Sequence, residues 1–90
     1  MLILDLHSFS EEQASKIKDG PYPDICIGVE KEYFDQDIFD KVVSIIKEKK
    51  YTYQINHPYV GSLVPNVVYN KQVHGKVVSI MIEVNKKIYL

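Results

Sequence analysis

Residues 77–84, Val77-Val78-Ser79-Ile80-Met81-Ile82-Glu83-Val84, form the stretch that decides the fold. The run is almost unbroken in apolar residues, and most of them are β-branched. Such a run lacks the alternation of a half-exposed strand and is typical of a strand that is buried on both faces. It therefore predicts the central strand of a covered sheet. Its one charged residue, Glu83, falls near the end.

Three further strands are predicted upstream, over residues 2–7, 24–29 and 51–55. Each is a short run rich in apolar or aromatic residues. The strands alternate with two predicted helices, which is the pattern of an α/β protein. We therefore expect a single α/β domain over residues 1–90, with a mainly parallel (mixed) sheet of about four strands and helices on its faces.

The two helices are predicted from caps and from periodicity. Ser10-Glu11-Glu12-Gln13 has the spacing of a capping box, which favours a short helix over about residues 11–18. Either Asp35 or Asp37 can cap the second helix. Its apolar residues follow a period of 3.6, and they are Ile38, Phe39, Val42, Val43, Ile45 and Ile46.

Composition excludes several classes of partner. The 11 basic residues, all of them Lys, and 12 acidic residues give a net charge of −1, which favours neither nucleic acid nor an anionic membrane. No apolar run reaches the roughly 18 residues that a membrane helix needs. The single cysteine, Cys26, cannot form an intrachain disulfide, and it is expected to be a small core residue. We expect a cytoplasmic protein.

Polar residues gather where the predicted strands end. His7 closes the first strand, Asn56 and His57 follow the third, and Glu83 lies near the end of the last. Ligands of parallel sheets collect at the carboxyl ends of the strands. The sequence therefore predicts a site built from these residues.

Each candidate also has a structural interpretation. Asp5 and His7, two apart on a strand, face the same side, so Asp5 can orient a metal-binding His7 or simply pair with it. Glu83 can act as a general base with a pKa raised by burial, or it can pair with Lys86 or Lys87 at the wet end of its strand. The loop after residue 55 can donate to a substrate or be an ordinary turn. His74 is expected at the surface.

Four motifs in order resemble the N-formylglutamate amidohydrolase family. Asp5-Leu6-His7-Ser8 is similar to its Asp-x-His-Ser strand end, and Pro23-Asp24-Ile25 with Ile27-Gly28 resembles its second strand. Two more segments resemble its Asn-x-Pro-Tyr-x-Gly loop and its Ile-Glu-Ile-Asn-Arg-x-Leu-Tyr signature; they are Asn56-His57-Pro58-Tyr59-Val60-Gly61 and Ile82-Glu83-Val84-Asn85-Lys86-Lys87-Ile88-Tyr89.

The resemblance implies a fold like that of zinc carboxypeptidases and hydrolysis of the amide bond of an N-formyl or N-acyl amino acid. It implies that His7 is a zinc ligand, with Asp5 behind it, and that Glu83 is the catalytic acid and base. The residues implied to bind substrate are Ser8, Asn56, Tyr59, Gly61, Asn85 and Lys86. Lys86 stands where the family has Arg.

The resemblance also implies that the zinc site is incomplete here. In the family, a further His and a Glu ligand precede the Asp-x-His-Ser motif, so the 90 residues are expected to correspond to the carboxy-terminal part of the catalytic domain. Two interpretations stay open. The chain is either part of a zinc-dependent amidohydrolase, or a non-catalytic truncated α/β module. The module would form a homo-oligomer or bind a small ligand or metal through His7, His57 and Glu83.

Overall fold

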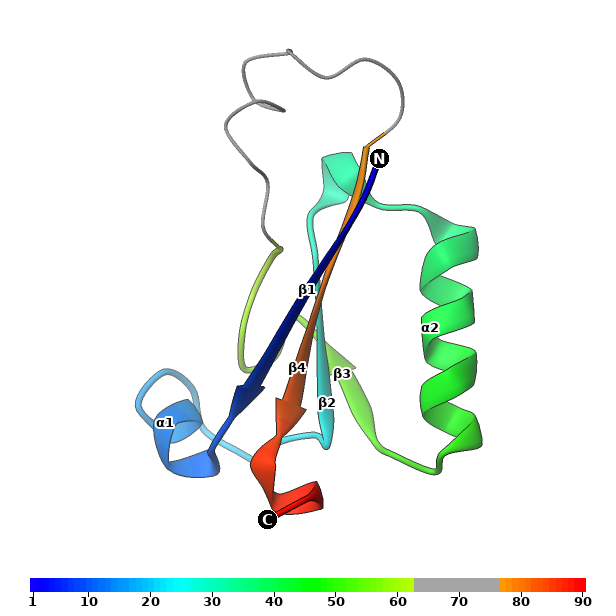
Figure 1. Cartoon of the computed structure of the whole chain (residues 1–90). Helices are drawn as coiled ribbons and strands as arrows, with labels where there is room; N and C mark the ends of the chain where they lie inside the picture. The colour runs from blue at the N-terminus through cyan, green and yellow to red at the C-terminus, as the bar shows by residue number, and fades with distance from the viewer. Residues whose placement is uncertain (63–76) are drawn as a thin grey trace.

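A computed structural model describes residues 1–62 and 77–90 (Figure 1). The described chain forms strands, two α-helices and two short 3-10 helices. In order, these are β1 (Leu2–Phe9), α1 (Glu11–Ser15), β2 (Ile25–Val29), η1 (Lys31–Tyr33), α2 (Gln36–Glu48), β3 (Tyr53–Ile55), β4 (Val78–Asn85) and η2 (Lys86–Ile88). The elements alternate as the sequence predicts.

The strands form one mixed four-stranded sheet in the order β1-β4-β2-β3. β1 runs parallel to β4, β2 runs parallel to β3, and β2 is antiparallel to β4. The predicted α/β class and the four-stranded mixed sheet are confirmed, and β4 lies between two other strands as its apolar run indicates. Because β2 and β3 run opposite to β1 and β4, the carboxyl ends of the four strands do not all lie at one edge of the sheet.

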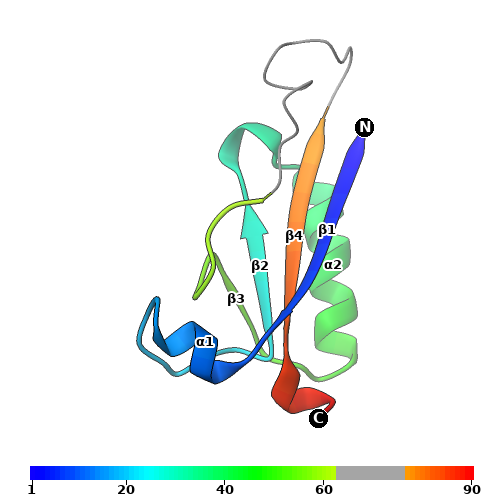
Figure 2. The ribbon, with the colours of Figure 1, turned by 60° about the vertical axis from the view of Figure 1, so that its left-hand side comes forward.

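The sheet packs a different core on each face. α2 lies along one face (Figures 1 and 2), over a cluster that contains Ile25, Ile27, Ile46, Val78 and Ile80. The opposite face carries a smaller cluster, formed by Phe9, Ala14, Cys26 and Met81 with Tyr22 and Tyr59 packed against it. Because successive side chains of a strand point to opposite faces, one strand can serve both clusters.

Both helices begin at the predicted caps. The Gln13 amide donates to Ser10 Oγ at 3.1 Å, and the Gln13 side-chain oxygen accepts from the Ser10 amide. The capping box is therefore confirmed. α1 ends at Ser15, earlier than predicted. For α2, the Ile38 amide donates to Asp35 Oδ1 at 3.0 Å, which makes Asp35 the cap and not Asp37. Among residues 1–62 and 77–90, no helix is long and apolar enough to cross a membrane.

The edge strand β1 leaves an apolar row uncovered. Leu4 pairs with Ile80 and Leu6 with Ile82 in the parallel register, so the even-numbered leucines face the same side as α2. α2 packs over the other strands, and Leu2, Leu4 and Leu6 stay 54%, 53% and 66% exposed. We call these three residues the leucine row.

Candidate active site

A row of polar side chains crosses the sheet on the face opposite α2. His7 in β1 and Cys26 in β2 are both in register with Glu83 in β4. Asp5 lies two residues before His7 and therefore on the same face. The pairing of β4 with both β1 and β2 thus brings together residues from both ends of the sequence. His7 and Glu83 lie inside their strands, since β1 continues to Phe9 and β4 to Asn85.

Asp5 fixes the ring of His7. His7 Nε2 lies 2.7 Å from Asp5 Oδ1, and Asp5 is the less exposed of the two side chains. A carboxylate accepts from a ring N–H, so in the neutral ring the proton lies on Nε2 and Nδ1 carries the lone pair. The predicted contact between Asp5 and His7 is present, and its geometry suits a ligand supported from behind by a carboxylate.

Glu83 is the most deeply buried charged group of the row. It is 7% exposed, and its Oε1 has no hydrogen-bond partner in the described parts of the chain. Burial raises the pKa of Glu83 above its usual range, while His7 lowers that pKa and Asp5 raises it. The alternative of a pair with Lys87 is not what the structure shows, because Lys87 Nζ lies 3.7 Å from Asp24 Oδ1.

Tyr59 joins this row from the loop that follows β3. Cys26 Sγ donates to the Tyr59 carbonyl at 3.3 Å, and the Tyr59 ring meets Phe9 edge-on, with ring centroids 5.5 Å apart. Burial raises the pKa of Tyr59, and the charges of Glu83 and Cys26 raise it further. The phenol therefore stays protonated at neutral pH and can donate a hydrogen bond on the face of the sheet that carries Glu83.

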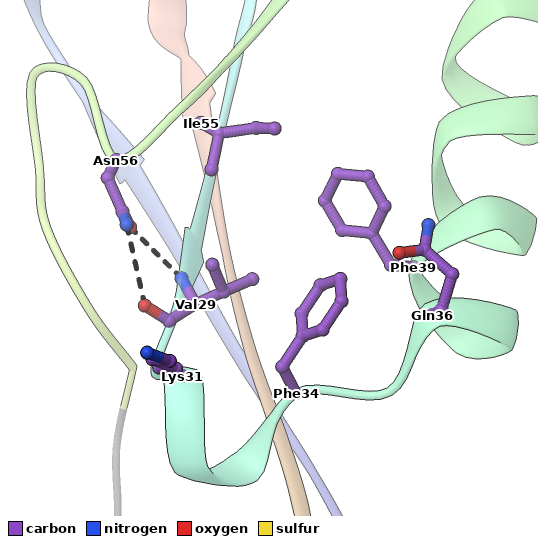
Figure 3. A pocket seen from close by; sticks show the side chains of 7 residues that line it. All are labelled: Val29, Lys31, Phe34, Gln36, Phe39, Ile55 and Asn56. Carbon is purple, nitrogen blue, oxygen red and sulfur yellow. Dashed lines mark hydrogen bonds between the residues drawn. The ribbon is translucent and has the colours of Figure 1, made fainter.

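The predicted substrate residue Asn56 uses its side chain within the protein. Asn56 Oδ1 accepts from the Val29 amide at 3.0 Å (Figure 3), and it also accepts from the Gly61 amide at 3.1 Å. Its Nδ2 donates to the Val29 carbonyl at 3.5 Å. The structure thus places Asn56 between β2 and the end of the loop, and it places Gly61 beside it.

The other predicted substrate residues differ in their placement: Ser8 lies on the opposite face, Lys86 lies beyond the end of β4, and Asn85 lies on the face of the row with its carboxamide hydrogen-bonded within the protein. Ser8 alternates with His7 and faces the α2 side, in register with Val84. Asn85 is fully buried, accepts from the Lys87 amide at 3.0 Å and donates to the Pro23 carbonyl at 3.2 Å. Lys86 begins η2 beyond the end of β4. Cys26 in the row and Phe9 next to it carried no functional signal in the sequence.

A separate hollow lies on the α2 side of the sheet. Its volume is about 450 Å³, and Figure 3 shows the rings of Phe34 and Phe39 along it. Val29 faces the core under α2, whereas Cys26 faces the polar row. The hollow is therefore distinct from the row. Its lining residues are Val29, Lys31, Phe34, Gln36, Phe39, Ile55 and Asn56.

The donors described do not complete a metal site. In residues 1–62 and 77–90, no group of three or more His, Cys, Asp and Glu side chains is placed to hold a metal ion. His7, supported by Asp5, suits one ligand position, and a catalytic zinc usually takes three protein ligands. His74 lies outside the described residues.

The fold and the row define an α/β protein with a buried carboxylate beside a carboxylate-supported histidine on the sheet face opposite α2. The chain belongs to the N-formylglutamate amidohydrolase family, whose model matches residues 1–90. No curated protein matches the chain.

A solved structure shares the fold. It is the N-formylglutamate amidohydrolase from Ralstonia eutropha JMP134, which superposes with a TM-score of 0.74 at 24% sequence identity. The match covers 99% of this chain and 33% of that one. This chain therefore spans about a third of the length of that enzyme.

Proposed function

We propose that this chain carries the proton-transfer part of an N-formylglutamate amidohydrolase site, with Glu83 as the general acid and base. The supporting observation is Glu83 itself. A carboxylate oxygen that is buried and has no partner among residues 1–62 and 77–90, next to a histidine held by Asp5, is costly to folding and suits a chemical role. Membership of the family supports the same role.

The environment of Glu83 suits proton transfer. A general base works best when its pKa lies near the working pH, and burial moves the pKa of Glu83 upward, in that direction. Glu83 would take a proton from water as the water attacks the amide carbon. It would then return the proton to the leaving amine. Tyr59, in the loop that follows β3, would donate a hydrogen bond to the substrate.

We propose zinc as the cofactor, with His7 Nδ1 as one ligand. When bound, zinc polarises an amide carbonyl and lowers the pKa of a bound water. The described residues supply this one ligand only, so the role given to Glu83 rests on its burial and its neighbours. The substrate would be an N-formyl or N-acyl amino acid. This matches the name of the similar enzyme from Ralstonia eutropha.

The test is hydrolysis of N-formyl-L-glutamate by the zinc-loaded chain. Glu83→Gln keeps the shape of the side chain and removes the base, so the rate should fall by about 10² or more. Glu48→Gln, at the exposed end of α2, is the matched control and should keep the parent rate. A parent chain that binds zinc without hydrolysing the substrate would refute catalysis by this chain. Equal rates for Glu83→Gln and the parent would refute the role of Glu83.

A second proposal is that the chain acts as a module that associates with a second copy through β1. The leucine row is more than half exposed, and β1 is one of the two edge strands of the described sheet. Exposed apolar rows and strand edges favour association. Sedimentation velocity should show the average mass rising with concentration. Leu4→Lys should weaken this rise, whereas Ile45→Lys, at an equally exposed position of α2, should not. A concentration-independent monomer would exclude the proposal.

We also propose a cytoplasmic location. Cys26 is a buried free thiol, and a single cysteine offers no intrachain disulfide, which suits a reducing compartment. Fractionation of cells that express the tagged chain tests this, and recovery outside the cytoplasmic fraction would contradict it.

A further inference from the structure

Asn56 lies where β3 leaves the sheet. β2 and β3 pair from Ile25 with Tyr53 to Ile27 with Ile55, and the Asn56 amide then donates to the Ile27 carbonyl at 2.8 Å. Asn56 adopts a positive φ of 55°, a left-handed conformation that asparagine tolerates better than most residues. The chain therefore turns away from β2 at this residue.

The side chain of Asn56 makes hydrogen bonds to β2 beyond the point where the β3 backbone stops pairing with it. The Val29 N–H and C=O point toward the side that β3 has vacated, and the carboxamide of Asn56 meets both of them (Figure 3). The same oxygen also accepts from Gly61, the residue that ends the loop. One side chain therefore ties both ends of the 56–61 loop to β2.

The other end of the loop is held by a close backbone contact. A Cβ on Gly28 would lie 2.1 Å from the Gly61 carbonyl oxygen, so the loop rests directly on the β2 backbone. Gly61 has a φ of 79°, and a Cβ there would lie 2.3 Å from Glu30 Oε1. Neither position accepts a side chain without movement. The loop has little freedom once Asn56 has closed it.

Tyr59 lies between these two attachments. Its carbonyl accepts from Cys26 Sγ, and its ring packs on Phe9, which places the phenol on the same face as Glu83. Cys26 is in register with Glu83, so the Tyr59 carbonyl contacts the β2 residue that neighbours Glu83 across the sheet.

We infer that Asn56 is a positioning residue that locks the 56–61 loop onto β2 and so holds Tyr59 on the face of the sheet that carries Glu83. This inference rests on the proposed function for the role of Glu83 and Tyr59, but not for the lock itself. It also assigns Asn56 a task different from direct contact with the substrate.

The test uses three variants of the 90-residue chain. Asn56→Gly keeps the left-handed backbone accessible and removes the carboxamide. Asn56→Asp keeps an oxygen that can accept from Val29 and Gly61. Gln54→Gly also removes a carboxamide side chain, at an exposed position of β3, and serves as the matched control. Amide hydrogen exchange is read at Gly61, and nuclear Overhauser contacts are read between the rings of Tyr59 and Phe9.

In Asn56→Gly, exchange at Gly61 should accelerate about tenfold, as expected for loss of a hydrogen bond, and the contact of Tyr59 with Phe9 should weaken. Asn56→Asp should restore both readouts to a large extent, and Gln54→Gly should leave both unchanged. Unaltered exchange and an unaltered ring contact in Asn56→Gly would overturn the inference. If Glu83→Gln hydrolyses as fast as the parent while Asn56→Gly still frees Tyr59, the proposed function fails and the lock stands.

Discussion

At the residue scale, Glu83 shows how the sheet changes the chemistry of a side chain. A glutamate near a strand end would normally meet water or a lysine. Here β1 and β2 flank it on both sides, and one of its oxygens has no partner in the described residues. The cost of this burial depends on protonation, so it can be measured as a dependence of stability on pH.

Glu83→Gln should change the pH dependence of unfolding. The pKa of Glu83 is raised from an ordinary value of 4.5, so its contribution to stability is fully present below about pH 4.5 and is lost as the pH rises through the folded-state pKa. Glutamine stays neutral at every pH. The variant should therefore be more stable than the parent at pH 7 and similar to it at pH 4, as measured by urea unfolding. A difference that does not vary with pH would contradict the burial argument.

Gly28→Ala should destabilise the chain. Its Cβ would meet the backbone oxygen of Gly61 and the Met81 side chain, and a backbone atom cannot move aside cheaply. A loss of about 1–3 kcal/mol in the free energy of unfolding is expected from such overpacking. The control is Gly20→Ala, whose Cβ would meet the Tyr22 ring at 3.1 Å. Gly20→Ala should lower the free energy of unfolding by less. Equal losses in the two variants would refute the close contact between Gly28 and the Gly61 carbonyl.

The sequence predicted contacts within one strand better than contacts between segments that are distant in the sequence. Asp5 and His7 pair as their spacing of two indicates, because strand alternation is a local property. Asn56 could be recognised as part of a shaped loop, but its partner Val29 lies on another strand. No local pattern identifies a hydrogen bond between two segments that only the fold brings together.

At the element scale, strand direction was harder to predict than strand position. The apolar run of β4 predicts a buried strand, yet such a run has the same composition in either direction. Its antiparallel pairing with β2 depends on the path of the chain after β3. The polar row survives this difference, because β1 and β2 both pair with β4, and the 56–61 loop brings Tyr59 to the same face.

The assignment of Asp35 as the cap of α2 can be tested at this scale. Asp35→Ala removes the acceptor of the Ile38 amide and should lower the free energy of unfolding by about 1 kcal/mol. Asp37→Ala, inside the first turn of α2, should cost less, because it loses only a favourable charge near the helix N-terminus. Thermal unfolding of both variants checks the order. A larger loss for Asp37→Ala would contradict the assignment of Asp35 as the cap.

At the scale of the whole molecule, a small net charge coexists with the leucine row. The calculated isoelectric point is about 6.3, and repulsion between copies is weakest there. Light scattering should therefore show the strongest self-association near that pH and less at pH 8.5. Leu4→Lys should reduce scattering at both pH values. Scattering that is independent of pH would show that charge does not control the association.

The pairing of β1 with β4 also has a consequence for how the chain acquires its structure. These strands come from opposite ends of the sequence, and β4 also occupies the middle of the sheet. Contacts between distant segments carry a large loop-closure cost and slow folding. During synthesis, β1 emerges from the ribosome long before its partner, with the leucine row exposed throughout. Protection by chaperones during that interval would therefore matter more for this chain than for a helical bundle of the same length.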